Sequence, residues 1–401
     1  MGSLIIMGSE RAGLALILGA LTALGPLSID MYLPALPALA RDLAAGPSLI
    51  QLTLTACLVG LALGQAVAGP LSDAVGRRRP LLAGGAVYAV SSALCVIAPT
   101  VQTLILLRLV QGAAGGAAIV IARAIVRDRC EGAAAARLFA LLMQISGVAP
   151  ILAPLIGGEI LRVTSWRGVF ALIAILGVAL VVAVLTALPE TLGRERRRPG
   201  GLGTTLRTFR QLVADRAFAG YALSSGLAFA AMFAYISGSP FVIQDVYGLS
   251  PQAFSLIFAL NGAGIVAAGQ VSGRLSARFP ATILLASGLA TSLGGALILL
   301  AAVLTGAGLP VPLAGMFLVV SGIGLTMPNG AALALSGQPP ERAGTASALL
   351  GLAQFVIGGA AAPLVGAFGT HTAVPMAVVI TALAAGAALA APARRTRTHR
   401  P

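Results

Sequence analysis

Long apolar runs separated by short polar breaks dominate the hydropathy pattern of this chain. A helix needs about 20 mostly apolar residues to cross the hydrocarbon core of a bilayer, and the pattern provides twelve such runs. They cover residues 12–36, 49–70, 81–99, 103–123, 137–160, 168–188, 217–240, 252–272, 281–303, 309–335, 343–368 and 372–392. The pattern therefore predicts an all-α membrane protein with twelve transmembrane helices.

The longest polar interval divides the predicted spans into two sets of six. We expect residues 1–190 to form an N-terminal six-helix bundle, 191–215 a cytoplasmic linker and 216–401 a C-terminal six-helix bundle. A short repeat supports this division, because Gly-x-Leu-Ser occurs at 69–72 after the second span and at 273–276 after the eighth. Two such halves related about the membrane normal are one architecture of secondary transporters.

Composition agrees with a membrane location. Hydrophobic residues make up 58 % of the 401 residues and charged residues 9 %, whereas a soluble domain carries about 25 % charged residues. A soluble protein with this composition lacks enough polar surface to cover its apolar residues. The N-terminal apolar run continues past Asp30 to Leu36, which is too long for the core of a cleavable signal peptide.

The net charge of +14 comes from 26 basic residues, all arginine, against 12 acids. In a soluble chain this excess would suggest a nucleic-acid partner. Here the arginines lie between apolar runs, so we expect no nucleic acid. Placing both termini in the cytoplasm puts 22 arginines on that side and only Arg41, Arg162 and Arg167 on the other. The positive-inside rule therefore favours cytoplasmic termini.

No enzymatic site is visible in the sequence. The histidines are His371 and His399, the three cysteines show no paired spacing, and no metalloprotease, serine-hydrolase or phosphate-loop motif occurs. We therefore expect neither an enzyme nor an ATP-driven pump, with no metal and no cofactor. A channel or a membrane receptor remains a physically possible alternative.

The loop after the second span contains regularly spaced glycines, an acid and arginines. Gly69, Asp73, Gly76, Arg77 and Arg78 match the G-x-L-x-D-x-x-G-R-R signature, which resembles the major facilitator superfamily. The glycines permit close helix approach and a tight turn. We expect Asp73, Arg77 and an arginine from residues 123–129 to form a cytoplasmic gate. The alternative is an ordinary positively charged loop.

Arg108 lies inside the fourth predicted span, in a stretch similar to the R-x-x-Q-G motif of the same superfamily. An arginine inside a span is a functional candidate because its charge is costly in hydrocarbon. The alternative is that its long side chain reaches back to the membrane surface.

The fifth span resembles the antiporter motif G-x-x-x-G-P-x-x-G-G. Its residues are Gly147, Pro150, Pro154, Gly157 and Gly158, with Ala153 where the motif has glycine. Small residues on one face let a neighbouring backbone approach, while prolines bend a helix. The alternative is the generic small-residue packing found in any membrane bundle.

Several further stretches narrow the resemblance. Residues 28–37, 189–192, 239–242, 258–261, 328–331 and 344–355 look like the bicyclomycin-resistance (Bcr/CflA) group of drug:proton antiporters. That resemblance implies a monomer in the bacterial inner membrane that exports small amphipathic drug-like molecules in exchange for protons. It implies the proton gradient as the energy source. The alternative is a proton-coupled exporter or symporter of an endogenous small metabolite.

Asp30 and Arg108 are the only formal charges well inside the predicted spans. Burial favours the neutral form of a carboxylate and a nearby cation favours its ionised form. We therefore expect Asp30 to carry the coupled proton and Arg108 to tune its protonation or orient the substrate, unless Asp30 is only a membrane-boundary residue. The expected substrate contacts are Tyr32, Tyr235, Phe258, Asn261 and Gln354.

Overall fold

The computed structural model describes residues 2–193, 195, 197 and 209–392, and no β-strand occurs among them. Its N-terminal elements are α1 (Gly2–Asp30), η1 (Leu33–Ala35), α2 (Leu36–Asp42), α3 (Pro47–Val75), α4 (Arg78–Val96), α5 (Val101–Arg129), α6 (Gly132–Val163) and α7 (Trp166–Ala187). Those that follow are α9 (Arg216–Phe241), η3 (Val242–Val246), α10 (Pro251–Leu275), α11 (Ala281–Thr305), α12 (Pro310–Ser336), α13 (Pro340–Ala367) and α14 (Val374–Ala390).

Eleven helices among the described residues are long and apolar enough to cross a membrane, and α14 is a shorter apolar helix. This confirms the predicted all-helical membrane fold. The first span, Gly13–Asp42, contains a break that the apolar pattern does not reveal. Helix α1 ends at Asp30, a 3-10 turn follows, and α2 then continues to Asp42. Pro34 and Pro37 have no backbone N–H to continue an α-helical ladder, which accounts for the break.

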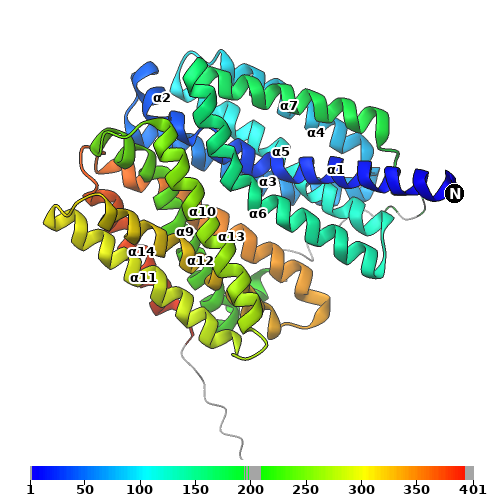
Figure 1. Cartoon of the computed structure of the whole chain (residues 1–401). Helices are drawn as coiled ribbons and strands as arrows, with labels where there is room; N and C mark the ends of the chain where they lie inside the picture. Colours follow the sequence, from blue (N-terminus) through cyan, green and yellow to red (C-terminus); the bar gives the residue numbers. More distant parts are fainter. Residues whose placement is uncertain (1, 194, 196, 198–208, 393–401) are drawn as a thin grey trace, which may run out of the picture. The chain divides into compact units, whose positions relative to one another are not determined.

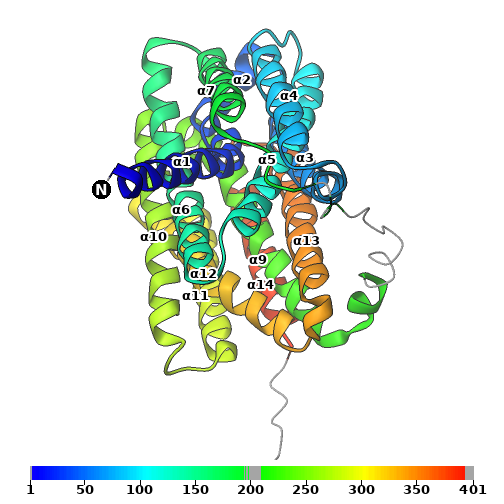
Figure 2. The same ribbon diagram turned by 90° about the vertical axis from the view of Figure 1, so that its right-hand side faces the viewer.

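The chain divides into two compact units, of which the first comprises Met1–Gly201 and Ile243–Ala259. Within it, α3 packs along α5, α4 lies against α5 and α7, and α1 contacts α5 and α6 (Figures 1 and 2). Helices α3 and α5 approach closely because Gly112 has no side chain. A Cβ at Gly112 would collide with the Cys57 carbonyl oxygen. The Ile243–Ala259 segment lies in the predicted C-terminal bundle but belongs to this unit by its contacts.

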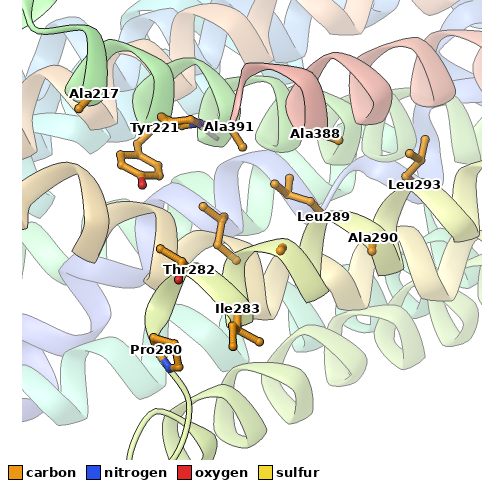
Figure 3. A pocket seen from close by; sticks show the side chains of 13 residues that line it. Ala217, Tyr221, Pro280, Thr282, Ile283, Leu289, Ala290, Leu293, Ala388 and Ala391 are labelled. Carbon is orange, nitrogen blue, oxygen red and sulfur yellow. The ribbon is translucent and has the colours of Figure 1, made fainter. Parts of the chain in front are cut away.

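The second unit comprises Leu202–Val242 and Leu260–Pro401. Within it, α9 packs against α12, α13 and α14, and α11 packs along α12 and α14. A groove with a volume of about 960 Å³ lies between α9, α11 and α14 (Figure 3). Its walls are mostly alanine, leucine and proline side chains, with Tyr221 and Thr282 as the two hydroxyl-bearing residues.

Candidate functional site

A fully buried arginine organises a polar cluster inside the first unit. No part of Arg108 is exposed to solvent. Its Nη2 donates to the Ser28 carbonyl oxygen at 2.6 Å, and its Nη1 donates to the Gln111 side-chain oxygen. Gln111 in turn donates from Nε2 to the Ser92 hydroxyl at 2.7 Å. The guanidinium is therefore held inside the unit and does not reach solvent.

Aromatic rings surround the same guanidinium. The Arg108 Cζ lies 4.5 Å from the centroid of the Tyr32 ring and 5.6 Å from that of Phe170. The two rings are themselves 5.4 Å apart. The Tyr32 hydroxyl is hydrogen-bonded to the Thr53 hydroxyl at 2.9 Å, which holds the ring in place. Ring faces attract a desolvated cation and replace part of its lost hydration.

Asp30 lies at the end of α1, two residues beyond the carbonyl that Arg108 binds. Only 5 % of its surface is exposed, and it is the one buried carboxylate among residues with described side chains. Within the described part of the chain, its carboxylate has no hydrogen bond and no cation within 4.0 Å. Arg108 of α5 therefore binds the last turn of α1, at whose end Asp30 lies, but no ion pair joins the two side chains.

The small residues of α6 contact the break in the first span. A Cβ at Gly157 would collide with the Met31 carbonyl oxygen, and one at Gly158 would lie 2.5 Å from the Ser255 hydroxyl. Gln252 also donates to the Gly158 carbonyl oxygen at 2.8 Å. Pro150 and Pro154 are accommodated inside the continuous helix. At Gly147, by contrast, an added Cβ would meet no atom within 4 Å.

The expected substrate contacts divide between the units. Tyr32 and Phe258 belong to the first unit and are buried. Tyr235, Asn261 and Gln354 belong to the second. There, Asn261 Nδ2 donates to the Tyr235 hydroxyl at 2.7 Å, which joins α9 to α10. Gln354 is half-buried on α13.

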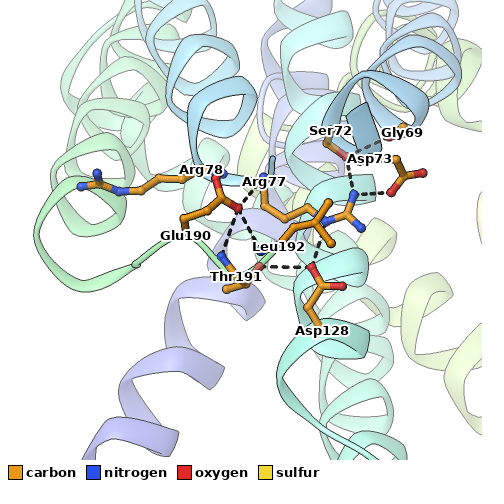
Figure 4. Close-up of polar contacts among 9 residues, drawn as sticks. All are labelled: Gly69, Ser72, Asp73, Arg77, Arg78, Asp128, Glu190, Thr191 and Leu192. Carbon is orange, nitrogen blue, oxygen red and sulfur yellow. Dashed lines mark hydrogen bonds and ion pairs between the residues drawn. The ribbon is translucent and has the colours of Figure 1, made fainter. Parts of the chain in front are cut away.

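A second polar cluster lies where α3 ends and α4 begins (Figure 4). The Arg77 guanidinium forms ion pairs with Asp73 at 2.5 Å and Asp128 at 2.9 Å, and it donates to the Ser72 hydroxyl at 2.8 Å. Asp128 also accepts a hydrogen bond from Thr191 Oγ1 at 3.1 Å. Burial opposes the charge on Arg77, but the two carboxylates outweigh it and raise the pKa of Arg77. We name this set, with Glu190, the Arg77 cluster.

Glu190 fastens the chain beyond α7 to the same turn (Figure 4). Its carboxylate accepts hydrogen bonds from the backbone N–H groups of Arg77 at 2.8 Å, Arg78 at 3.2 Å, and Thr191 and Leu192 at 3.0 Å each. Burial alone would raise the pKa of Glu190, but these four donors outweigh it and lower that pKa. Gly76 has φ +104°, and a Cβ there would lie 2.6 Å from the Glu190 Oε2.

The family model of the Major Facilitator Superfamily matches residues 18–363. The chain belongs to this superfamily. It is therefore a multi-pass secondary transporter and not an enzyme.

Two bacterial proteins are similar to this transporter over most of its length. The transporter is 43 % identical to the "Uncharacterized MFS-type transporter YdgK" of Bacillus subtilis, over 93 % of each chain. It is 30 % identical to the "Bicyclomycin resistance protein homolog" of Haemophilus influenzae, over 92 % of this chain and 94 % of that protein. The solved structure of the nucleoside transporter NupG matches its fold with a TM-score of 0.76 and 14 % identity, over 94 % of this chain and 98 % of that one.

The sequence-based prediction of a cytoplasmic gate omitted two acids of the Arg77 cluster. It expected Asp73 and Arg77 to be joined by an arginine from residues 123–129, whereas that stretch contributes Asp128 to the cluster. A signal was available, because an acid between Arg127 and Arg129 is unusual in a positive loop. Glu190 lies 113 residues from Arg77, and no local pattern indicates that pairing.

Packing at Gly157 leads to a matched test. In the transporter, Gly157→Ala should force α6 away from Met31, lower the free energy of unfolding by about 1–3 kcal/mol and reduce transport. Gly147→Ala is the control, because it makes the same change on the same helix in open space. Thermal unfolding in detergent and initial transport rates measure both effects. Equal behaviour of the two variants would show that this contact is unimportant.

Proposed function

We propose that this transporter exports small amphipathic drug-like molecules in exchange for protons, as a monomer in the bacterial inner membrane. Two observations support the proposal. A relative at 30 % identity over most of both chains is named a bicyclomycin resistance protein homologue. The first unit also contains a buried carboxylate, Asp30, two residues from the Ser28 carbonyl that the buried, aromatic-lined Arg108 binds.

The burial of the Asp30 carboxylate is the main observation in favour of proton coupling. A lone carboxylate in an apolar helix bundle favours its neutral form, and access to water favours ionisation. Alternating access then allows Asp30 to load a proton from the outer side and release it to the cytoplasm. Substrate binding competes with one of the two protonation states, which makes the exchange obligatory.

Arg108 has a positioning role in this proposal. Its hydrogen bond to the Ser28 carbonyl oxygen fixes the last turn of α1, at whose end Asp30 lies. A cation held near that turn tunes the protonation of Asp30 or helps to orient the substrate. Tyr32, Phe258, Tyr235, Asn261 and Gln354 remain the proposed substrate contacts.

The Arg77 cluster supplies the proposed cytoplasmic gate. Gly69 lies near the end of α3 and Gly76 directly follows it, and Arg77 joins the ends of α3 and α5 through Asp73 and Asp128. Arg78 contributes a hydrogen bond from its side chain to the Leu185 carbonyl oxygen at 2.7 Å. We propose that these contacts stabilise the closed cytoplasmic side and must rearrange in each transport cycle.

The proton gradient is sufficient for this work. One proton moving inward through 100 mV yields about 2.3 kcal/mol. At about 1.4 kcal/mol per tenfold ratio, that energy supports roughly a 50-fold gradient of an electroneutral substrate.

Drug-susceptibility profiling tests the substrate class. The protein is expressed in an efflux-deficient bacterial host and challenged with bicyclomycin, chloramphenicol and a sulfonamide. The minimum inhibitory concentration of at least one drug should rise severalfold and return to background with Asp30→Asn. An unchanged profile for the whole panel, with the protein present in the membrane, would favour the endogenous-metabolite alternative.

Topology follows from the arginine distribution and can be tested at Cys130, between α5 and α6. Cys57 and Cys95 are buried, whereas Cys130 is half-buried. A membrane-impermeant maleimide should label Cys130 only after cells are permeabilised, because we propose that this loop is cytoplasmic. The control is Val163→Cys in a Cys130→Ser background, at the other end of α6, where Val163 is 87 % exposed. Rapid labelling of Cys130 in intact cells would reverse the orientation.

A further inference from the structure

The groove of the second unit has two chemically different ends (Figure 3). The Tyr221 and Thr282 hydroxyls lie at the end near Ala217 and Pro280, and Leu293 and Ala388 line the opposite, apolar end. The Tyr221 hydroxyl forms no hydrogen bond with any of the described residues. An elongated site that is polar at one end and apolar along its length matches one chain of a lipid and its headgroup.

Helix boundaries place the polar end at the membrane surface. Ala217 is the second residue of α9, Pro280 directly precedes α11, and Ala391 directly follows α14. All three lie at the ends of membrane-spanning or apolar helices. The apolar end therefore runs into the depth of the bilayer, where an acyl chain lies.

Charge at this end favours an anionic headgroup. Arg216 and Arg278 are exposed, one and two residues from the groove-lining Ala217 and Pro280. Asp215 is the nearby acid, but it accepts hydrogen bonds from the Ala217 N–H at 2.9 Å and from Gln338 Nε2 at 2.7 Å. Its charge is thus directed to the N-terminus of α9.

We infer that this groove binds one acyl chain of an anionic phospholipid, with the headgroup held by Arg216 and Arg278. Basic pockets between transmembrane helices on the cytoplasmic side are typical sites for anionic headgroups. The volume of about 960 Å³ lies in the range of ligand pockets. The inference is independent of which substrate is transported and of how protons are coupled.

Native mass spectrometry of the full-length detergent-purified protein, titrated with phosphatidylglycerol or phosphatidylcholine, tests the site. Phosphatidylglycerol should bind more tightly. Each arginine near a membrane surface contributes about fivefold to anionic-lipid affinity, so Arg216→Gln with Arg278→Gln should weaken phosphatidylglycerol binding by about 25-fold. Arg137→Gln, an exposed arginine of the first unit, is the matched control and should leave binding unchanged.

A second variant tests the chain-binding part of the groove. Ala290 is exposed and lines the groove on α11, so Ala290→Trp should fill it and also weaken phosphatidylglycerol binding. Equal affinity for the two lipids, or full affinity in the double arginine variant, would overturn the inference. Full phosphatidylglycerol affinity in Ala290→Trp would show that the acyl chain does not bind in the groove. Because the readout is lipid binding, none of these outcomes depends on drug export.

Discussion

Asp30→Asn should abolish proton-driven uphill transport while leaving substrate binding largely intact. The substitution fixes an uncharged side chain of nearly the same volume at a buried position that has no ion-pair partner among the described residues. A neutral site still accommodates substrate but has no proton to exchange, so concentration against a gradient fails. Uphill efflux and equilibrium binding, measured separately in proteoliposomes, resolve the two effects.

Glu159→Gln is the matched control for Asp30→Asn. It makes the same carboxylate-to-amide change on α6, at a side chain that is 61 % exposed and forms an ion pair with the equally exposed Arg162. Exposed ion pairs contribute little, so this variant should transport normally. If Asp30→Asn still accumulates substrate against its gradient with normal proton release, the coupling site lies elsewhere.

Arg77→Gln should produce the largest loss of stability among the gate residues. It removes both ion pairs of a side chain that is 8 % exposed, and it leaves the 11 % exposed Asp128 carboxylate with the Thr191 hydroxyl but without the Arg77 cation. Removing one partner of a buried pair costs about 3–5 kcal/mol, which is the expected decrease in the free energy of unfolding. Turnover should fall as well, because the proposed gate loses the ion pairs that join the ends of α3 and α5.

Two further variants separate stability from gating. Asp73 is 54 % exposed, so Asp73→Asn should slow transport while leaving folding and equilibrium substrate binding largely unchanged. Arg79→Gln changes an exposed neighbouring arginine and should affect neither property. Unfolding in detergent and turnover in proteoliposomes are the two measurements. A fully stable Arg77→Gln protein with normal turnover would show that the cluster is not a gate.

The membrane fold could be predicted because each span needs its own run of apolar residues. The same pattern could not reveal the break after Asp30, since Met31, Leu33 and Leu36 continue the apolar run while the local prolines interrupt the helix. A run of apolar residues indicates that a segment lies in the bilayer. It does not indicate which backbone hydrogen bonds the segment forms there.

Contacts within the candidate site could be predicted only where both residues belong to one short sequence motif. Asp73 and Arg77 are four residues apart in one such motif, so their ion pair is local in the chain. The bond from Arg108 to the Ser28 carbonyl spans 80 residues, and it depends on the close packing of helices rather than on a local motif. A carbonyl acceptor is also invisible in the sequence, since every residue has one.

The direction of drug movement under an imposed pH gradient tests drug:proton antiport most directly. Proteoliposomes containing the wild-type protein are loaded with equal bicyclomycin concentrations inside and outside, and an acid-interior pH gradient is then imposed. The proposal predicts that drug moves inward as protons leave, by up to about tenfold per pH unit for one proton per uncharged drug molecule at zero membrane potential, and that a protonophore abolishes this movement. Outward drug movement, in the same direction as the protons, would contradict antiport.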